Sequence, residues 1–152
     1  MQLKIVTPER EVLSDDVDQV TLPTQDGEIT VLPHHIALVS VLKPGELVIK
    51  KGSEVIPFAV SGGMIRVTET GVTILADTAE RVEEIIEERA RLAHEAAQKL
   101  LEEKKFDASE YATIAAKMEK ELARLHVARK WRHRGHPPIS ITSDTQTDTE
   151  KK

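Results

Sequence analysis

Cysteine is absent from this chain of 152 residues, and aromatic side chains make up only 3% of it. The absence of cysteine excludes disulfide bonds, zinc–thiolate sites, iron–sulfur clusters and a thiol nucleophile. No apolar run approaches the roughly 20 residues that a membrane-spanning helix requires, so we expect no direct membrane insertion. Polar and apolar residues already alternate from Met1 to Val6, as in a strand, which leaves no room for a signal or transit peptide. We therefore expect a cytoplasmic protein.

Basic residues are the minority among the charged ones. The chain has 21 lysines and arginines against 26 aspartates and glutamates, so its formal net charge is -5. This balance argues against a general nucleic-acid-binding surface, and any basic function has to be local. The length suits one modest domain or two small ones.

Glycine and proline are concentrated in the first half of the chain. Residues 1–78 hold six of the seven glycines and five of the seven prolines, which is typical of short strands joined by tight turns. Apolar residues alternate with polar ones in segments such as Val17 to Leu22, Ala37 to Val41 and Val72 to Leu75. About nine such segments without intervening helices predict an antiparallel β-sandwich or flattened barrel over residues 1–78.

The second half has the composition of helices. No glycine or proline occurs between Asp77 and Arg134, and helix-forming residues dominate. Asp77 with Glu80, and Asp107 with Glu110, have the spacing of capping boxes, which predicts two helix starts. A short turn at Lys104 to Phe106 separates the two predicted helices. Helices joined by so short a turn should form an antiparallel α-helical hairpin over residues 79–134. Residues 135–152 are polar and lack periodicity, which predicts a disordered tail.

The sequence offers little chemistry of its own. Gly62-Gly63 lacks the lysine and hydroxyl residue of a phosphate-binding loop and precedes a strand, so we interpret it as a turn or bulge. The adjacent His34 and His35 would point to opposite faces of an extended segment and have no accompanying ligand cluster. We therefore expect no catalytic residues, no metal and no cofactor.

Charge is distributed unevenly between the two halves. Residues 1–78 contain 6 basic and 11 acidic residues, whereas residues 79–134 contain 13 and 12. Cations crowd the end of the second predicted helix: Arg124, Arg129, Lys130, Arg132 and Arg134. Compensation of the helix dipole is one explanation. The other is docking on an acidic partner surface, because one helix end needs fewer charges.

The apolar face of the hairpin is rich in alanine. Each methylene that alanine lacks relative to leucine forfeits about 0.8 kcal/mol of burial free energy, so the hairpin should dock weakly. A well-capped helix pair could then detach without losing its helices. A hairpin that stays packed on the sandwich is the alternative.

Three segments carry a family resemblance. They read TQDGEITVLPHH at 24–35, SGG at 61–63 and GVTILADTAER at 71–81. Together with a strand-rich half followed by a helical hairpin, they resemble the epsilon subunit of bacterial F-type ATP synthases. The resemblance covers about residues 3–131.

This resemblance implies a non-catalytic central-stalk subunit of a proton-translocating ATP synthase, peripheral to the cytoplasmic face of the bacterial plasma membrane. The sandwich would bind the gamma subunit and the membrane ring. The family's ring-contacting acids lie in the turn that holds Asp26 and Glu28 here, and its gamma-facing histidine matches His35. A solvated turn is the alternative for the two acids.

Several positions depart from the family pattern. His34 stands where the family usually has glycine, which puts the local turn in question. Family members that bind ATP on the hairpin have an aspartate where this chain has Ile86, ahead of Arg89, and two arginines at Lys120 and Arg124. Ile86 lacks a hydrogen-bond acceptor, and a lysine lacks the arginine fork. The sequence therefore predicts weak or absent ATP binding.

The resemblance also assigns a partner to the basic cluster. In the family the hairpin is a movable brake on ATP hydrolysis, and its second helix approaches an acidic loop of the catalytic beta subunits. The residues that match this role form the predicted inhibitory basic patch: Arg124, Arg129, Lys130 and Arg132.

A function of another class stays open. The chain could be a stand-alone β-sandwich binding module whose helical arm self-associates through the apolar stripe from Tyr111 to Leu125. That hypothesis predicts a stable homo-oligomer, whereas the rotor hypothesis predicts a monomer that joins a hetero-complex. An enzyme is the third possibility, and no nucleophile, base and ligand constellation supports it.

Overall fold

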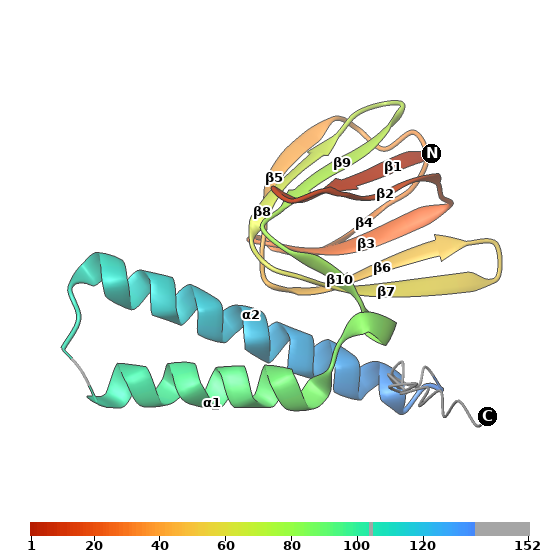
Figure 1. The fold of residues 1–152 in the computed structure, drawn as a ribbon. Coiled ribbons are helices and arrows are strands. Elements are labelled where there is room, and N and C mark those ends of the chain that lie inside the picture. The colour runs from red at the N-terminus through yellow and green to blue at the C-terminus, as the bar shows by residue number, and fades with distance from the viewer. Residues whose placement is uncertain (104, 136–152) are drawn as a thin grey trace, which may run out of the picture.

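A computed structural model describes residues 1–103 and 105–135 of the chain (Figure 1). The sheet domain comes first and the helices follow. Its strands are β1 (Gln2–Val6), β2 (Glu11–Asp16), β3 (Gln19–Thr24), β4 (Gly27–Val31), β5 (Leu38–Leu42), β6 (Gly45–Lys51), β7 (Glu54–Val60), β8 (Gly63–Val67), β9 (Gly71–Ala76) and β10 (Ala79–Arg81). The fold class predicted from the sequence, a sandwich followed by a helical hairpin, is confirmed.

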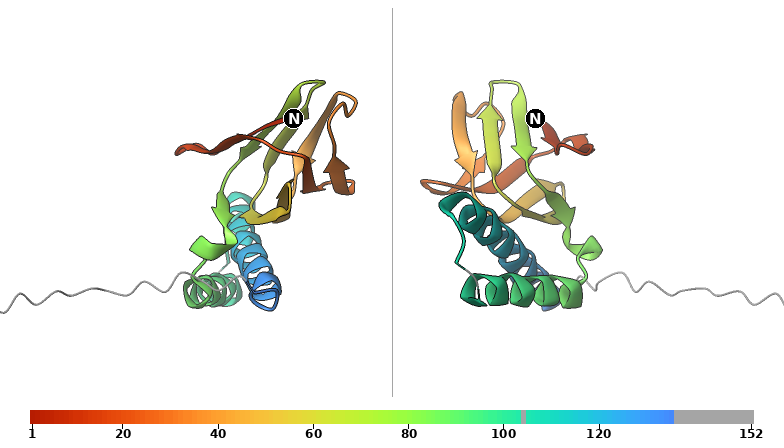
Figure 2. Two further views of the ribbon diagram at one scale, coloured as in Figure 1. Left: turned by 90° about the vertical axis from the view of Figure 1, so that its right-hand side faces the viewer. Right: turned by 60° about the vertical axis from the view of Figure 1, so that its left-hand side comes forward.

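The strands form a sheet that bends around one core. Their order is β10-β7-β6-β3-β5-β8-β9-β1-β2, and β4 pairs with β3. Only Thr24 and Leu42 pair between β3 and β5, and this narrow join lets the two halves face each other (Figures 1 and 2). The pairs are antiparallel except for β1 with β9, which run parallel. Alternate residues point inward and are fully buried, including Leu3, Ile5, Leu22, Leu47, Ile49, Phe58, Ile65 and Ile74.

The first helix begins later than the sequence predicts. The prediction that a helix starts at Asp77 is wrong, because Ala79–Arg81 form β10 and pair with β7. A 3-10 turn at Val82–Glu84 follows, and α1 spans Glu87–Glu103. Pairing with β7 and burial of Ala79 in the sandwich core override the local helix signal. The sheet therefore extends through Arg81, beyond the predicted boundary at 78.

The second helix begins where predicted. Helix α2 spans Ala108–Arg132, and Asp107 caps it. The Glu110 amide donates to the Asp107 carboxylate at 2.8 Å, and the Asp107 amide donates to the Glu110 carboxylate at 3.2 Å. These two bonds confirm the capping box. The predicted disordered tail lies, from residue 136 on, outside the described residues.

Helices α1 and α2 form an antiparallel hairpin that lies against the sheet. Helix α2 contacts β6, β7 and the 3-10 turn, and α1 packs on α2. The sheet and α1 flank α2 (Figures 1 and 2). The hairpin is therefore folded back, and α2 is the helix that attaches it to the sandwich.

Strands β8 and β9 are packed closely at Gly63, which leaves no room for a side chain. A Cβ at this position would overlap the Leu75 carbonyl oxygen, which is fixed backbone, whereas a Cβ at Gly62 would meet nothing closer than the Asp77 carboxylate at 3.4 Å. We expect Gly63→Ala to lower the free energy of unfolding by about 1–3 kcal/mol, because the clash forces the strands apart. Urea denaturation measures this change. Gly62→Ala is the matched control, and equal stability of the two variants would contradict the expectation.

Candidate functional site

The predicted ring-contacting acids lie at an exposed hairpin tip. Strands β3 and β4 are joined at Gln25-Asp26, and Gly27 has a φ of 122°, which glycine adopts without strain. The Thr24 hydroxyl donates to the Gly27 carbonyl at 2.6 Å and fixes the turn. Asp26 and Glu28 are exposed, and neither has an ion-pair partner among the described residues. Both carboxylates are thus presented on a rigid turn.

The histidine pair lies in the loop between β4 and β5. His34 has a φ of 64°, in the left-handed region that glycine favours. His34 therefore adopts the same left-handed turn conformation that a glycine at this position would adopt. The half-buried His35 donates from its amide to the Leu32 carbonyl at 3.2 Å, and its Nδ1 donates to the Ile36 carbonyl at 2.7 Å. These bonds fix the orientation of the His35 ring.

An apolar surface covers the outside of β5, β8 and β9. Val41 pairs with Met64, and Met64 pairs with Leu75, so the three side chains lie in one row on the same face. All three are about half exposed, as is the neighbouring Val39. We name Val39, Val41, Met64 and Leu75 the outer apolar face. Contiguous exposed apolar residues of this kind mark interaction sites.

This face corrects the sequence interpretation of β5. Alternation predicts a half-buried strand through Ala37, Val39 and Val41, whereas the structure buries Leu42 on the opposite row and exposes Val39 and Val41. Leu38 and Leu42 form a second apolar row on the same strand, and alternation alone cannot tell which row is covered. The sequence therefore missed the outer apolar face.

The hairpin docks through a small apolar cluster. Val127, Ala128 and Trp131 of α2 pack against Ala59 of β7 and against Val82 and Ile85, which lead into α1. Trp131 is 5% exposed, and its indole N–H donates to the Glu46 carboxylate of β6. A buried tryptophan requires such a partner.

Every residue of the predicted basic patch is ion-paired within the chain. Arg124 binds Glu80 of β10 and Glu121 of α2, each at 2.6 Å. Lys130 pairs with Glu46. Arg129, at 2.9 Å, and Arg132 both pair with Glu87 at the start of α1. In this folded-back form the patch is held by carboxylates from four elements, β6, β10, α1 and α2.

Arg124 is the most enclosed of these cations. Its side chain is 18% exposed, and that of Glu121 is 7% exposed. Burial opposes the charge on the guanidinium, but hydrogen bonds and attraction from Glu121 and Glu80 outweigh it and raise the pKa of Arg124. Arg124 therefore stays charged and committed to its two partners.

The three candidate nucleotide residues do not line one common cavity. Lys120 lines a cavity of ≈ 510 Å³ that includes neither Arg89 nor Arg124. Arg89 lies exposed on α1. The same cavity is lined by the carboxylates of Asp77, Glu119 and Glu121 and by two lysines, Lys117 and Lys120. Its acidic side chains outnumber the basic ones, which disfavours a phosphate group.

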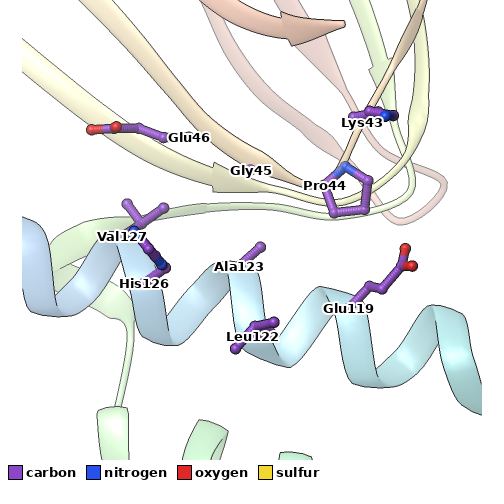
Figure 3. A pocket seen from close by; sticks show the side chains of 9 residues that line it. All are labelled: Lys43, Pro44, Gly45, Glu46, Glu119, Leu122, Ala123, His126 and Val127. Atoms are coloured by element: carbon purple, nitrogen blue, oxygen red, sulfur yellow. The ribbon is translucent and has the colours of Figure 1, made fainter. Parts of the chain in front are cut away.

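A second cavity interrupts the contact between α2 and the sandwich. It has a volume of ≈ 410 Å³ and lies between the turn at Lys43-Pro44 and the stretch of α2 from Glu119 to Val127. Ala123 and Val127 point from α2 toward the sheet, while a gap stays open beside Pro44 (Figure 3). The hairpin is therefore incompletely packed on the sandwich along this part of α2.

The described residues provide neither a metal site nor a membrane-spanning helix. Residues 1–103 and 105–135 contain no group of three histidine, aspartate or glutamate side chains placed to hold a metal ion. Within the same residues, neither helix has the length and apolar character needed to cross a membrane.

Comparison with known proteins places this geometry in a family. Residues 1–82 match the family model described as the β-sandwich domain of the ATP synthase delta/epsilon chain. An ATP synthase epsilon chain from Chloroflexus aggregans is 48% identical over 129 residues, which cover 85% of this chain and 92% of that one. The epsilon chain of Herpetosiphon aurantiacus is 42% identical over 134 residues, or 88% and 98% of the two chains.

Solved structures agree with these relatives. A chain of the Euglena gracilis mitochondrial ATP synthase, determined with OSCP, F1 and c-ring, has a TM-score of 0.67 and 27% identity over 80% of this chain and 76% of that one. A chain of the Tetrahymena thermophila central stalk and c-ring has a TM-score of 0.57 and 21% identity over 86% and 94%. The second match supports the fold alone. From the family model and the relatives together, the chain belongs to the ATP synthase epsilon family.

Proposed function

We propose that this chain is a non-catalytic rotor subunit in the central stalk of a proton-translocating ATP synthase. It would be peripheral to the cytoplasmic face of the bacterial plasma membrane, couple the gamma subunit to the membrane ring, and slow ATP hydrolysis through its hairpin. The observation that carries the proposal is the way α2 docks. The helix is held by a small apolar cluster and by charges, so it can leave the sandwich without exposing the sandwich core.

Two surfaces of the sandwich suit the coupling role. The outer apolar face belongs to β5, β8 and β9, whereas the hairpin occupies β6 and β7. A partner can therefore bind the face while the hairpin stays docked. We assign the outer apolar face and the neighbouring His35 to the gamma subunit, and Asp26 and Glu28 at the β3–β4 tip to the membrane ring.

The stand-alone module is the weaker candidate. Its self-association stripe is largely used within the docked hairpin, because Leu125 is buried and Ile114, Ala115 and Met118 are half-buried. Under the rotor proposal the isolated chain should elute from a sizing column as a monomer, and a stable homo-oligomer would favour the module instead.

Charge on the outer apolar face should abolish its contact with gamma. We expect Val41→Glu or Met64→Lys to weaken binding of the purified gamma subunit by about tenfold or more, because a charge would be buried in an apolar interface. Isothermal titration calorimetry measures the affinity. Ser53→Glu adds a charge at an exposed turn between β6 and β7 and is the control. Unchanged affinity for gamma in both variants of the outer apolar face would show that gamma does not bind this surface.

The brake is tested by hydrolysis. We expect the full chain to slow ATP hydrolysis by an epsilon-free catalytic head that carries gamma, and a chain ending at Arg81 to have no such effect. This end point keeps β10 paired with β7. Gln in place of Arg124, Arg129, Lys130 and Arg132 should relieve inhibition, because these cations would contact the acidic loop of the beta subunits. Unchanged inhibition by the fourfold variant would reject the basic patch as the inhibitory element.

Nucleotide binding by the isolated chain should be weak or absent. Arg124 is neutralised by Glu80 and Glu121, and the cavity at Lys120 is lined by Glu121 together with two further carboxylates, Asp77 and Glu119. We expect a calorimetric titration with ATP to give no saturable binding up to about millimolar concentration, because the fork of Arg124 is already held by two carboxylates. A dissociation constant in the micromolar range would contradict this expectation.

A further inference from the structure

The seam between α2 and the sandwich combines two kinds of contact. The apolar part consists of six buried residues, of which Trp131 is the one aromatic side chain; the others are Ala59, Val82, Ile85, Val127 and Ala128. The charged part crosses from the helix to two different strands. Lys130 and the Trp131 indole both bind Glu46 of β6, and Arg124 binds Glu80 of β10 at 2.6 Å. Two carboxylates of the sandwich thus bind α2 at positions that are more than one helical turn apart, Arg124 and Lys130.

These carboxylates are partly withdrawn from water. The Glu46 side chain is 16% exposed and the Glu80 side chain 32% exposed. Ion pairs so placed are screened less than pairs on the open surface, and loss of one partner leaves the other charge poorly solvated. The pairs should therefore contribute a substantial part of the docking free energy.

The same pairs also decide whether the cations are available. Lys130 is paired with Glu46, and Arg124 is paired with Glu80. Neither cation can therefore bind an acidic surface of another molecule while these pairs are intact. Undocking of α2 would release Lys130 from Glu46 and Arg124 from Glu80, would leave Arg124 paired only with Glu121 of its own helix, and would leave both carboxylates on the sandwich. Departure of the hairpin would therefore be an exchange of carboxylate partners.

We propose that Glu46 and Glu80 form an electrostatic latch that holds α2 on the sandwich and keeps Lys130 and Arg124 from an acidic partner. The partner rests on the proposed function, whereas the latch itself is a property of the isolated chain. Two consequences follow. Salt should release the hairpin, and loss of a latch carboxylate should release it without removing any cation.

The chain contains no cysteine, so a single introduced thiol reports opening of the seam. In full-length chain carrying Ala128→Cys, the rate of thiol labelling measures how often α2 leaves the sandwich. Val127→Cys is a second site in the same cluster, should the first substitution disturb docking. Val67→Cys lies in the sandwich core and reports global unfolding alone.

We expect Glu46→Gln and Glu80→Gln each to speed labelling at residue 128 by about fivefold, with no change at residue 67, since an ion pair is lost while the shape is kept. Raising the salt concentration should act in the same direction on the natural seam. Glu95→Gln is the matched control, because it removes a carboxylate that pairs with Arg91 on α1. Labelling that responds neither to salt nor to the two variants would overturn the latch.

Hydrolysis assays separate the latch from the brake. Both latch variants should inhibit the catalytic head more strongly than the natural chain, in contrast to the fourfold basic-patch variant. If labelling responds as expected but no chain slows hydrolysis, the latch stands and the proposed brake fails. If labelling does not respond, the latch fails whatever hydrolysis shows.

Discussion

The attachment of α2 to β6 and β7 determines the form of the whole molecule. Helix α1 packs on α2, so the position of the hairpin follows from one seam. That seam centres on Trp131, whose ring is buried in a cluster with Ile85, two valines and two alanines and whose N–H requires the Glu46 carboxylate. A cluster of six buried residues is small beside the sandwich core, and the charges around Trp131 add to its attraction.

Most of the fold could be predicted from the sequence because its signals are local. Turn residues and alternation define the strands, and the Asp107 capping box defines the start of α2. The segment after Asp77 could not be predicted, since its capping pattern competes with the pairing of β10 on β7. A partner strand some distance along the chain overrode the local preference, and the helix start moved to Glu87.

The candidate site was less accessible to sequence reasoning. The cations of α2 are visible as a cluster, but the partner of Lys130 lies 84 residues earlier in the chain, and nothing in the sequence links the two. The outer apolar face was missed for a different reason. Strand β5 has apolar residues on both of its faces, so only the arrangement of the neighbouring strands determines which one remains in solvent. Contact of Asp26, Glu28 and His35 with partner subunits stays a prediction.

The parallel pairing of β1 with β9 also bears on how the molecule is made. Leu3 lies opposite Val72, so the hairpin of β1 and β2 cannot join the rest of the sheet until nearly the whole sandwich has been synthesised. Contacts this distant along the chain close slowly. The hairpin is synthesised afterwards and consists of local contacts that form rapidly. Folding should therefore end when the preformed helix pair docks on the completed sandwich. The release of the hairpin proposed above would reverse this last step.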